Sequence, residues 1–236
     1  QDVTEEEFVK TILEDQPFIP SYFGFNVDIN KEGATNSETA FSNIPLNFGI
    51  ADFKNDNQLI IDVRSAANYK KNHIEGSVNI IAETEDDKLE TWLGAIVEPN
   101  EDFHLVINSI SDRETILSRI AKIGYEKQIK SVITLGEDNF KTFESLDLDS
   151  FKENPTEYTI IDIRNKSEVA EGMFFENAIS IPLNELRNSV EKIPTKKPIV
   201  VHCAGGYRSA AGSSVISKLI DSVAVYDLSD NVKDFK

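Results

Sequence analysis

The stretch that decides the fold of this chain is Ile199-Val200-Val201-His202-Cys203-Ala204-Gly205-Gly206-Tyr207-Arg208. Its first four residues form a short apolar run that predicts a buried strand. The two glycines that follow predict a tight turn. Residues Ser209 to Ile220 then carry apolar side chains at helical spacing, so a helix is expected behind the turn. The stretch therefore predicts a strand, a glycine-rich turn and a helix N-terminus that meet at one thiol.

Cys203 is the only cysteine of the 236 residues. Inward-pointing amides of such a turn and the dipole of the following helix favour a thiolate, which is the nucleophilic form of cysteine. We expect Cys203 and Arg208 to be catalytic. The loop amides of Ala204, Gly205, Gly206, Tyr207 and Ser209 are expected to bind the substrate. The alternative for a lone cysteine is a small buried apolar residue. Strand alternation points His202 away from the thiol, which favours a structural role for that histidine.

The loop resembles the active-site loop of rhodaneses, a family of sulfurtransferases. Upstream, Ile160-Ile161-Asp162-Ile163-Arg164 resembles the family's apolar strand that ends in Asp-x-Arg, and Ala178-Ile179-Ser180-Ile181-Pro182 resembles another family segment. The resemblance implies that Cys203 carries a sulfane sulfur atom as a persulfide. It also implies that Arg187 binds the anionic sulfur donor, because family members often recruit a basic residue from this region.

Loop length separates sulfur transfer from a related chemistry. Four residues stand between Cys203 and Arg208, whereas the related cysteine phosphatases and arsenate reductases have a longer loop. A shorter loop suits a single sulfur atom better than a tetrahedral oxyanion, so phosphatase or arsenate reductase activity is the weaker alternative.

An internal repeat divides the chain. Leu59 to Arg64 recurs as Thr159 to Arg164, and Leu105 to Asn108 followed by Arg113 parallels Ile199 to Cys203 followed by Arg208. Short apolar strands alternate with helical patterns, which predicts an α/β fold with parallel sheets. We expect two tandem rhodanese-like domains, each a parallel sheet flanked by helices, over residues 46–145 and 146–236.

The first copy lacks the thiol and the loop glycines, so residues 46–145 are expected to be catalytically silent. It keeps Asp62 and Arg64, which match Asp162 and Arg164. Because the pair also occurs beside a loop without a thiol, a scaffold role is favoured for Asp162 and Arg164 over a direct substrate role.

Composition excludes several function classes. The net charge is −17, and residues 1–150 hold 13 basic and 29 acidic residues, so nucleic acid and anionic membranes are poor partners. The partners expected are small anionic sulfur donors and thiol acceptors. One cysteine fits a reducing, cytoplasmic compartment. Three scattered histidines, His73, His104 and His202, predict no metal site, and no cofactor is expected.

Residues 1–45 do not follow the rhodanese pattern. Two prolines with aromatic neighbours, from Gln16 to Phe23, resemble the closing segment of the metallo-β-lactamase-fold domain in bacterial persulfide dioxygenase–rhodanese fusion proteins. Glu90-Thr91-Trp92-Leu93-Gly94 also resembles a stretch of their first rhodanese-like domain. The resemblance implies that the chain is part of a longer polypeptide and that it contacts an upstream metal-binding dioxygenase domain.

The function expected from these patterns is sulfur transfer from thiosulfate or a low-molecular-weight persulfide to a thiol, sulfite or cyanide. A second class of function stays open, in which both domains serve only as docking or dimerisation modules. Whether the chain forms a homo-oligomer is also left open.

Overall fold

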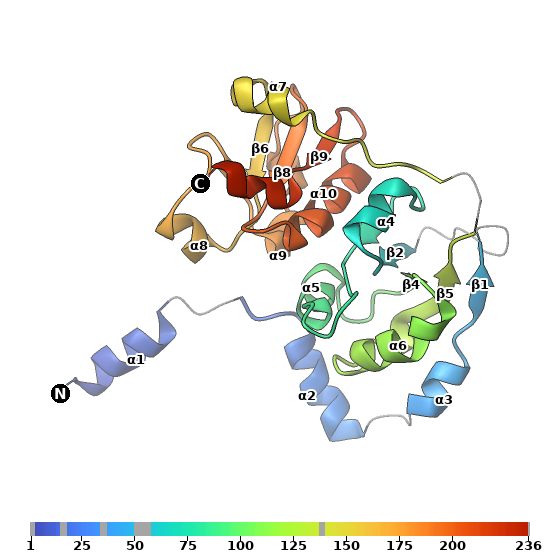
Figure 1. Ribbon diagram of the computed structural model, residues 1–236. Coiled ribbons are helices and arrows are strands. Elements are labelled where there is room, and N and C mark those ends of the chain that lie inside the picture. The colour runs from blue at the N-terminus through green and yellow to red at the C-terminus, as the bar shows by residue number, and fades with distance from the viewer. Residues whose placement is uncertain (1–2, 15–17, 34–36, 50–57, 137–139, 236) are drawn as a thin grey trace.

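The computed structural model describes residues 3–14, 18–33, 37–49, 58–136 and 140–235. These residues form two α/β units joined by the segment that follows β5 (Figure 1). Every paired strand in both sheets runs parallel to its neighbours. The predicted α/β class, with parallel sheets flanked by helices, is therefore confirmed.

The first unit contains a five-stranded sheet in the order β1-β5-β4-β2-β3. Its central strands are buried along their whole length, as expected for a parallel sheet that is covered on both faces. Its strands are β1 (Leu46–Phe48), β2 (Leu59–Asp62), β3 (Val78–Asn79), β4 (Phe103–Ile107) and β5 (Ile129–Thr134). Its helices are α4 (Ala66–Lys71), α5 (Leu89–Ile96) and α6 (Arg113–Ala121), with 3₁₀ turns η1 (Ile110–Asp112) and η2 (Glu126–Gln128).

The second unit contains a four-stranded sheet in the order β7-β6-β8-β9. Its strands are β6 (Thr159–Asp162), β7 (Ile179–Ser180), β8 (Ile199–His202) and β9 (Val225–Asp227). Its helices are α7 (Leu148–Glu153), α8 (Lys166–Glu171), α9 (Leu183–Leu186) and α10 (Tyr207–Leu219), with 3₁₀ turns η3 (Pro155–Glu157), η4 (Val190–Lys192) and η5 (Ser229–Phe235). The order β3-β2-β4 in the first sheet corresponds to β7-β6-β8 in the second, which confirms the internal repeat.

The strand register corrects one detail of that repeat. Asp62 pairs with Val106 in the first sheet, and Asp162 pairs with His202 in the second. Val106 is therefore the counterpart of His202, and Ile107 is the counterpart of Cys203. The predicted match of Asn108 with Cys203 was therefore wrong by one residue. It aligned the two loops on Arg113 and Arg208, but the loop of the first domain is one residue longer.

The two units share one apolar core. A single cluster of buried side chains continues from the strands of the first sheet to those of the second. Helix α10 is central to this arrangement, since it packs against β8 and β9 of its own sheet and against β3 of the first. Gly212 allows α10 to lie close to its own sheet, because a Cβ atom there would lie 2.6 Å from the Ile163 side chain.

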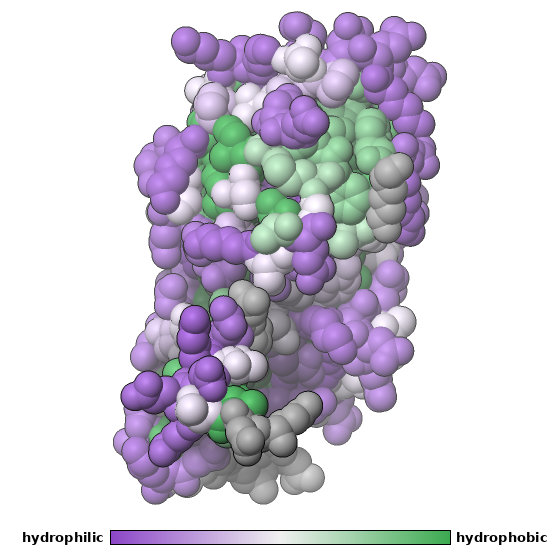
Figure 2. All heavy atoms as spheres, turned by 90° about the vertical axis from the view of Figure 1, so that its left-hand side faces the viewer, coloured by the Kyte–Doolittle hydropathy of each residue, from purple (hydrophilic) through white to green (hydrophobic). Residues whose placement is uncertain are grey.

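A second apolar cluster lies on the other face of the second sheet. It contains Phe151, Ile160 and Val200, and its partly buried members include Phe174 and Phe235. Figure 2 shows a broad apolar region on this domain, bordered by polar residues.

The described residues before β1 form the helices α1, α2 and α3. Helix α1 (Glu5–Leu13) has no buried residue and projects away from both domains in Figure 1. Helix α2 (Tyr22–Glu32) packs on the first domain, where a Cβ atom on Gly94 would lie 2.0 Å from the Tyr22 ring. Helix α3 (Ser37–Ser42) lies against α6. No helix in the described residues is long and apolar enough to cross a membrane.

Candidate active site around Cys203

Cys203 lies directly after β8, and three residues separate it from the first residue of α10. Its residue surface is only 2% exposed. The backbone N–H of Gly206 donates a hydrogen bond to its Sγ atom over 3.1 Å. The thiol thus lies at the N-terminus of a 13-residue helix, where the helix dipole and an amide donor both favour negative charge on sulfur.

Gly206 has a backbone conformation that other residues rarely adopt, with a φ angle of +96°. A Cβ atom at this position would also lie 2.8 Å from the backbone nitrogen of Asp230 and 3.0 Å from the carbonyl carbon of Ser229. Only glycine can therefore turn its N–H toward the sulfur and still leave room for η5.

The other predicted loop residues differ in their surroundings. Ser209 is fully buried, and its hydroxyl donates a hydrogen bond to the Gly206 carbonyl over 3.0 Å. A Cβ atom on Gly205 would meet nothing within 4 Å, and Ala204 is half-buried. The loop is thus held firmly at its helical end and is open around Gly205.

Arg208 is paired with Glu168 of α8, a residue that the sequence analysis did not identify. The guanidinium donates from Nη1 to Oε2 over 2.6 Å and from Nη2 to Oε1 over 2.7 Å. Burial acts to lower the pKa of Arg208, but hydrogen bonds to Glu168 and the charges of Glu168 and Cys203 outweigh it, so this pKa is raised. Arg208 therefore stays charged beside the thiol.

A local signal for Glu168 was present in the sequence. Asn165 and Glu168 form a capping box at the start of α8, directly after Arg164. The Asn-x-x-Glu spacing predicts this cap. Its second role, as the partner of Arg208 across 40 residues of sequence, carries no local signature.

Asp162 and Arg164 form a buried pair, and Asp162 lies beside His202 in the sheet, one residue before Cys203. Arg164 donates to both carboxylate oxygens of Asp162, with Nη2 2.6 Å from Oδ2, and Nη2 also donates to the Gly172 carbonyl over 2.9 Å. Asp62 and Arg64 repeat this geometry in the first domain, with the same atoms 2.7 Å apart. The repeated pair lies beside a loop without a thiol, which favours the scaffold role.

His202 is fully buried among Phe174, Phe175 and the Asp162 carboxylate. Its Nε2 atom lies 3.7 Å from Asp162 Oδ2, and its ring lies 5.1 Å from that of Phe175. Burial lowers the pKa of His202, and the nearby Asp162 charge offsets this only in part. These surroundings favour a neutral, structural imidazole.

The first domain contributes directly to the surroundings of the Cys203 loop. The Tyr207 hydroxyl donates to the carbonyl of Ile81 over 2.8 Å. The Trp92 ring lies 5.8 Å from the Arg208 guanidinium carbon, within cation–π range. Both residues of the first domain lie far from the loop in sequence, and spacing within the loop could not reveal them.

Arg187 is held at another part of the domain junction. It donates two hydrogen bonds to the Glu101 carboxylate, over 2.8 and 2.9 Å, and a further one to the carbonyl of Ile96. It lines a cavity of about 370 Å³ together with these residues. Its partners belong to the first domain, so the geometry ties Arg187 to domain packing.

Residues 50–134 and 147–233 each match the rhodanese-like domain family. No match was found among curated proteins. A rhodanese-related protein from Thermoplasma volcanium is 30% identical, covers 39% of this chain and 90% of its own length, and has a TM-score of 0.35.

Two other solved structures cover more of the chain at lower identity. A 3-mercaptopyruvate sulfotransferase from Escherichia coli is 18% identical over 78% of this chain and 98% of its own, with a TM-score of 0.31. A metallo-β-lactamase from Staphylococcus aureus is 21% identical over 56% of this chain and 36% of its own, with a TM-score of 0.43. Since the family matches account for most of its residues, this chain belongs to the rhodanese-like domain family and contains two such domains in tandem.

Proposed function

We propose that the protein is a sulfurtransferase in which Cys203 carries a sulfane sulfur atom. The observation that carries this proposal is the 3.1 Å contact between the Gly206 N–H and the Cys203 sulfur at the N-terminus of α10. An amide donor and a helix N-terminus are groups that favour a nucleophilic cysteine.

The reaction has two steps that share one intermediate. The Cys203 thiolate attacks the outer sulfur of thiosulfate, a new S–S bond forms, and sulfite leaves with the electron pair of the old bond. An acceptor such as cyanide then attacks the terminal sulfur of the Cys203 persulfide. The S–S bond breaks toward Cys203, the thiolate is regenerated, and thiocyanate leaves. A low-molecular-weight persulfide as donor and a thiol or sulfite as acceptor follow the same steps.

The loop supports both steps electrostatically. The amides from Ala204 to Ser209 stabilise the transferred sulfur, and Arg208 compensates the charge of an anionic donor. Glu168 orients the Arg208 guanidinium through its two hydrogen bonds. The guanidinium keeps further N–H groups that this carboxylate does not use.

The experiment that tests the proposal compares the protein with its Cys203→Ser variant in thiosulfate–cyanide turnover. We expect wild-type protein to gain one sulfur atom in intact-protein mass spectrometry after thiosulfate treatment, and the variant to gain none and to lose turnover. Retained turnover in the variant contradicts the proposal. A protein without sulfur uptake fits a docking module, and turnover of a phosphate ester fits a cysteine phosphatase.

We also propose that these domains act beside a metallo-β-lactamase-fold persulfide dioxygenase domain. The support is the resemblance of residues 1–45 to the closing segment of that domain in fusion proteins. Sequencing of the complete reading frame tests this. A His-x-His-x-Asp-His motif upstream is expected, and a complete reading frame without one contradicts the proposal.

A further inference from the structure

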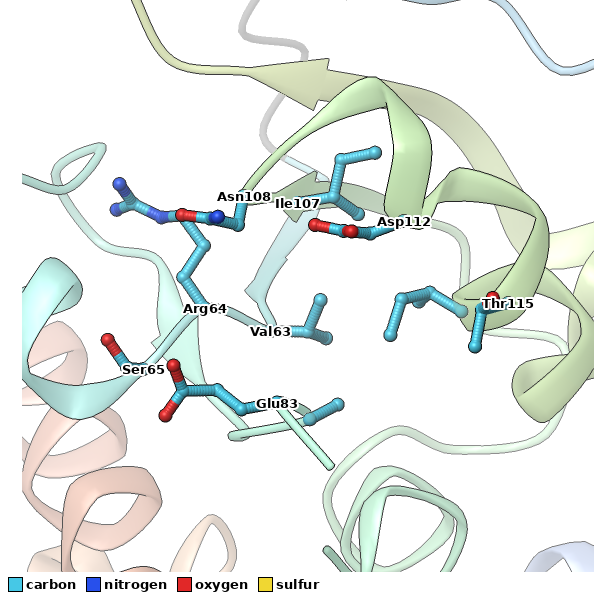
Figure 3. A pocket seen from close by; sticks show the side chains of 10 residues that line it. Val63, Arg64, Ser65, Glu83, Ile107, Asn108, Asp112 and Thr115 are labelled. Atoms are coloured by element: carbon cyan, nitrogen blue, oxygen red, sulfur yellow. The ribbon is translucent and has the colours of Figure 1, made fainter. Parts of the chain in front are cut away.

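The first domain has a cavity of about 290 Å³ at the carboxyl end of its strands β2 and β4. This is the edge where open α/β sheets place their ligands, and it matches the position of the Cys203 loop in the second domain. Figure 3 shows side chains from the ends of both strands and from α6 around this space. The cavity is lined by Val63, Arg64, Ser65, Ala82, Glu83, Ile107, Asn108, Asp112, Thr115 and Ile116.

The loop over this cavity is wider than its counterpart in the second domain. Five residues separate Ile107 from the first residue of α6, whereas three separate Cys203 from α10. The wider loop contains η1, which brings Asp112 to the cavity. An isoleucine at the place of the thiol cannot act as a nucleophile, so this space is suited to binding and not to sulfur chemistry.

The cavity has an apolar floor. Val63, Ile107 and Ile116 are buried and line it from two strands and a helix, and Ala82 adds a small apolar side chain. Its volume is close to the lower limit of small-molecule sites. A ligand therefore needs a short aliphatic body.

The charged groups around the floor are mainly acidic. Figure 3 shows the carboxylates of Glu83 and Asp112 on different sides of Val63. Arg64 also lines the cavity, but its guanidinium is already paired with the buried Asp62 carboxylate, with Nη2 2.7 Å from Oδ2, and donates to the Asn72 carbonyl. Among the described residues, neither the Glu83 nor the Asp112 carboxylate forms an ion pair, and both repel anions such as thiosulfate.

The Glu83 and Asp112 carboxylates differ in the hydrogen bonds that they accept within the protein. Asp112 accepts a hydrogen bond from the Ser109 N–H over 3.1 Å and one from the Ser111 hydroxyl over 3.3 Å. Among the residues that the structure describes, no side chain forms a hydrogen bond or ion pair with the exposed carboxylate of Glu83. Ser65 and Thr115 add hydroxyl groups nearby. Donor-rich groups of a ligand would thus find several acceptors, since a carboxylate offers about four lone-pair sites.

We propose that this cavity binds a small organic cation, an alkylammonium whose head lies between Glu83 and Asp112 and whose chain covers Val63, Ile107 and Ile116. The ammonium group supplies three donors and one positive charge to the carboxylates. The aliphatic chain covers the apolar floor. Within the described residues, no group of three or more His, Cys, Asp or Glu side chains could hold a metal ion, so the acidic rim suits an organic cation better.

The test is a titration of the full chain with n-butylammonium chloride, followed by methyl NMR of Val63, Ile107 and Ile116. We expect saturable shifts of these methyl groups and none with sodium butyrate, which has the same chain length and the opposite charge. Glu83→Gln and Asp112→Asn should each weaken binding about tenfold. Glu83→Gln breaks no hydrogen bond within the described residues, so it tests the site without a loss of folding.

Two controls make the outcome specific. Glu85→Gln changes a nearby exposed carboxylate that does not line the cavity, and it should leave binding unchanged. Cys203→Ser should also leave binding unchanged, because the cavity takes no part in sulfur transfer. Non-saturating shifts, equal binding of butyrate, or full affinity in the Glu83→Gln variant would each overturn the proposal.

Discussion

At the scale of single residues, the Arg208–Glu168 pair decides the electrostatics around Cys203. The pair is partly buried, with side chains 14% and 32% exposed. The Arg208 hydrogen bonds lower the pKa of Glu168, so this carboxylate stays ionised and holds the guanidinium in place. A change to one partner leaves the other charge without compensation beside the thiol.

This ion pair predicts that substitutions of Arg208 and Glu168 have coupled effects on activity. Arg208→Ala should lower kcat/KM for thiosulfate at least tenfold, because it leaves the Glu168 carboxylate unpaired where the proposed anionic donor binds. Adding Glu168→Gln to Arg208→Ala should recover part of the loss, and steady-state kinetics of the double-mutant cycle measures the coupling. Lys166→Ala, on the same helix α8 as Glu168, removes an exposed ion pair with Glu185 of α9 and should have little effect. Strictly additive losses would contradict the prediction.

His202 predicts how stability depends on pH. Its pKa in the folded chain is lowered by burial below the usual 6.5, so the unfolded chain binds more protons as pH falls. The contribution of His202 is therefore complete above about pH 6.5 and declines as pH falls toward its folded pKa, by up to ~1.4 kcal/mol per pH unit.

Urea unfolding at about pH 7.5 and about pH 5.5 checks this. His202→Gln should unfold with a smaller difference between the two pH values than the wild type. Burial also lowers the pKa of His73, so His73→Gln should give a similar reduction and the double variant a larger one. An unchanged pH dependence in both single variants would refute the buried, neutral state of these histidines.

At the scale of secondary-structure elements, the turn between β8 and α10 positions the thiol. The turn works because Gly206 takes a positive φ angle and lies against the start of η5. Sulfur placement thus depends on contact between two segments, the loop and the C-terminal η5, and not on the loop alone.

Two adjacent glycines provide a matched test of this turn. Gly206→Ala should lower stability by about 1–3 kcal/mol and reduce sulfur transfer at least tenfold, because the backbone strain and the clash with Asp230 displace the N–H that contacts sulfur. Gly205→Ala should be tolerated, since a Cβ atom there meets nothing within 4 Å. Thermal melting and thiosulfate–cyanide turnover measure both. Equal effects of the two changes would show that the turn geometry is not what matters.

At the scale of the whole molecule, the first domain packs against α10 and α9 of the second domain. The Asn79 N–H donates to the Ser214 hydroxyl of α10 over 2.9 Å, and Lys70 pairs with Asp227 over 2.7 Å. The Arg187–Glu101 pair and the Tyr207 hydrogen bond to Ile81 add to the same junction. Removal of the first domain would expose the buried face of α10.

We therefore expect residues 146–236 alone to be less stable than the full chain, or to aggregate. A domain of this size buries little apolar surface on its own, and its core continues into the first domain. Thermal melting, size-exclusion chromatography and thiosulfate–cyanide turnover of the isolated domain measure the effect. A monomeric, fully active isolated domain would contradict the supporting role of the first domain.

Local pattern predicted much of the fold and some of the site. The apolar runs that begin at Leu59 and Thr159 predicted strands, and the glycines after Cys203 predicted a turn. Each of these signals depends only on residues close in sequence, and the structure confirms each of them. The match of Asn108 with Cys203 failed because loop length varies while strand register does not. The registers of β4 and β8 are set by hydrogen bonds to β2 and β6.

The sequence by itself determined that there are two parallel α/β units and that one thiol lies between a strand and a helix N-terminus, because strand and helix periodicity and turn residues act over short distances. Only the tertiary structure decided that Glu168 holds Arg208 and that Trp92 and Ile81 of the first domain border the loop. It also decided that Arg187 joins the two domains and that the first domain has a cavity lined by two carboxylates. These contacts join residues that are tens of positions apart in sequence. The packing of the two sheets around α10 brings these residues together, and no local sequence pattern encodes that packing.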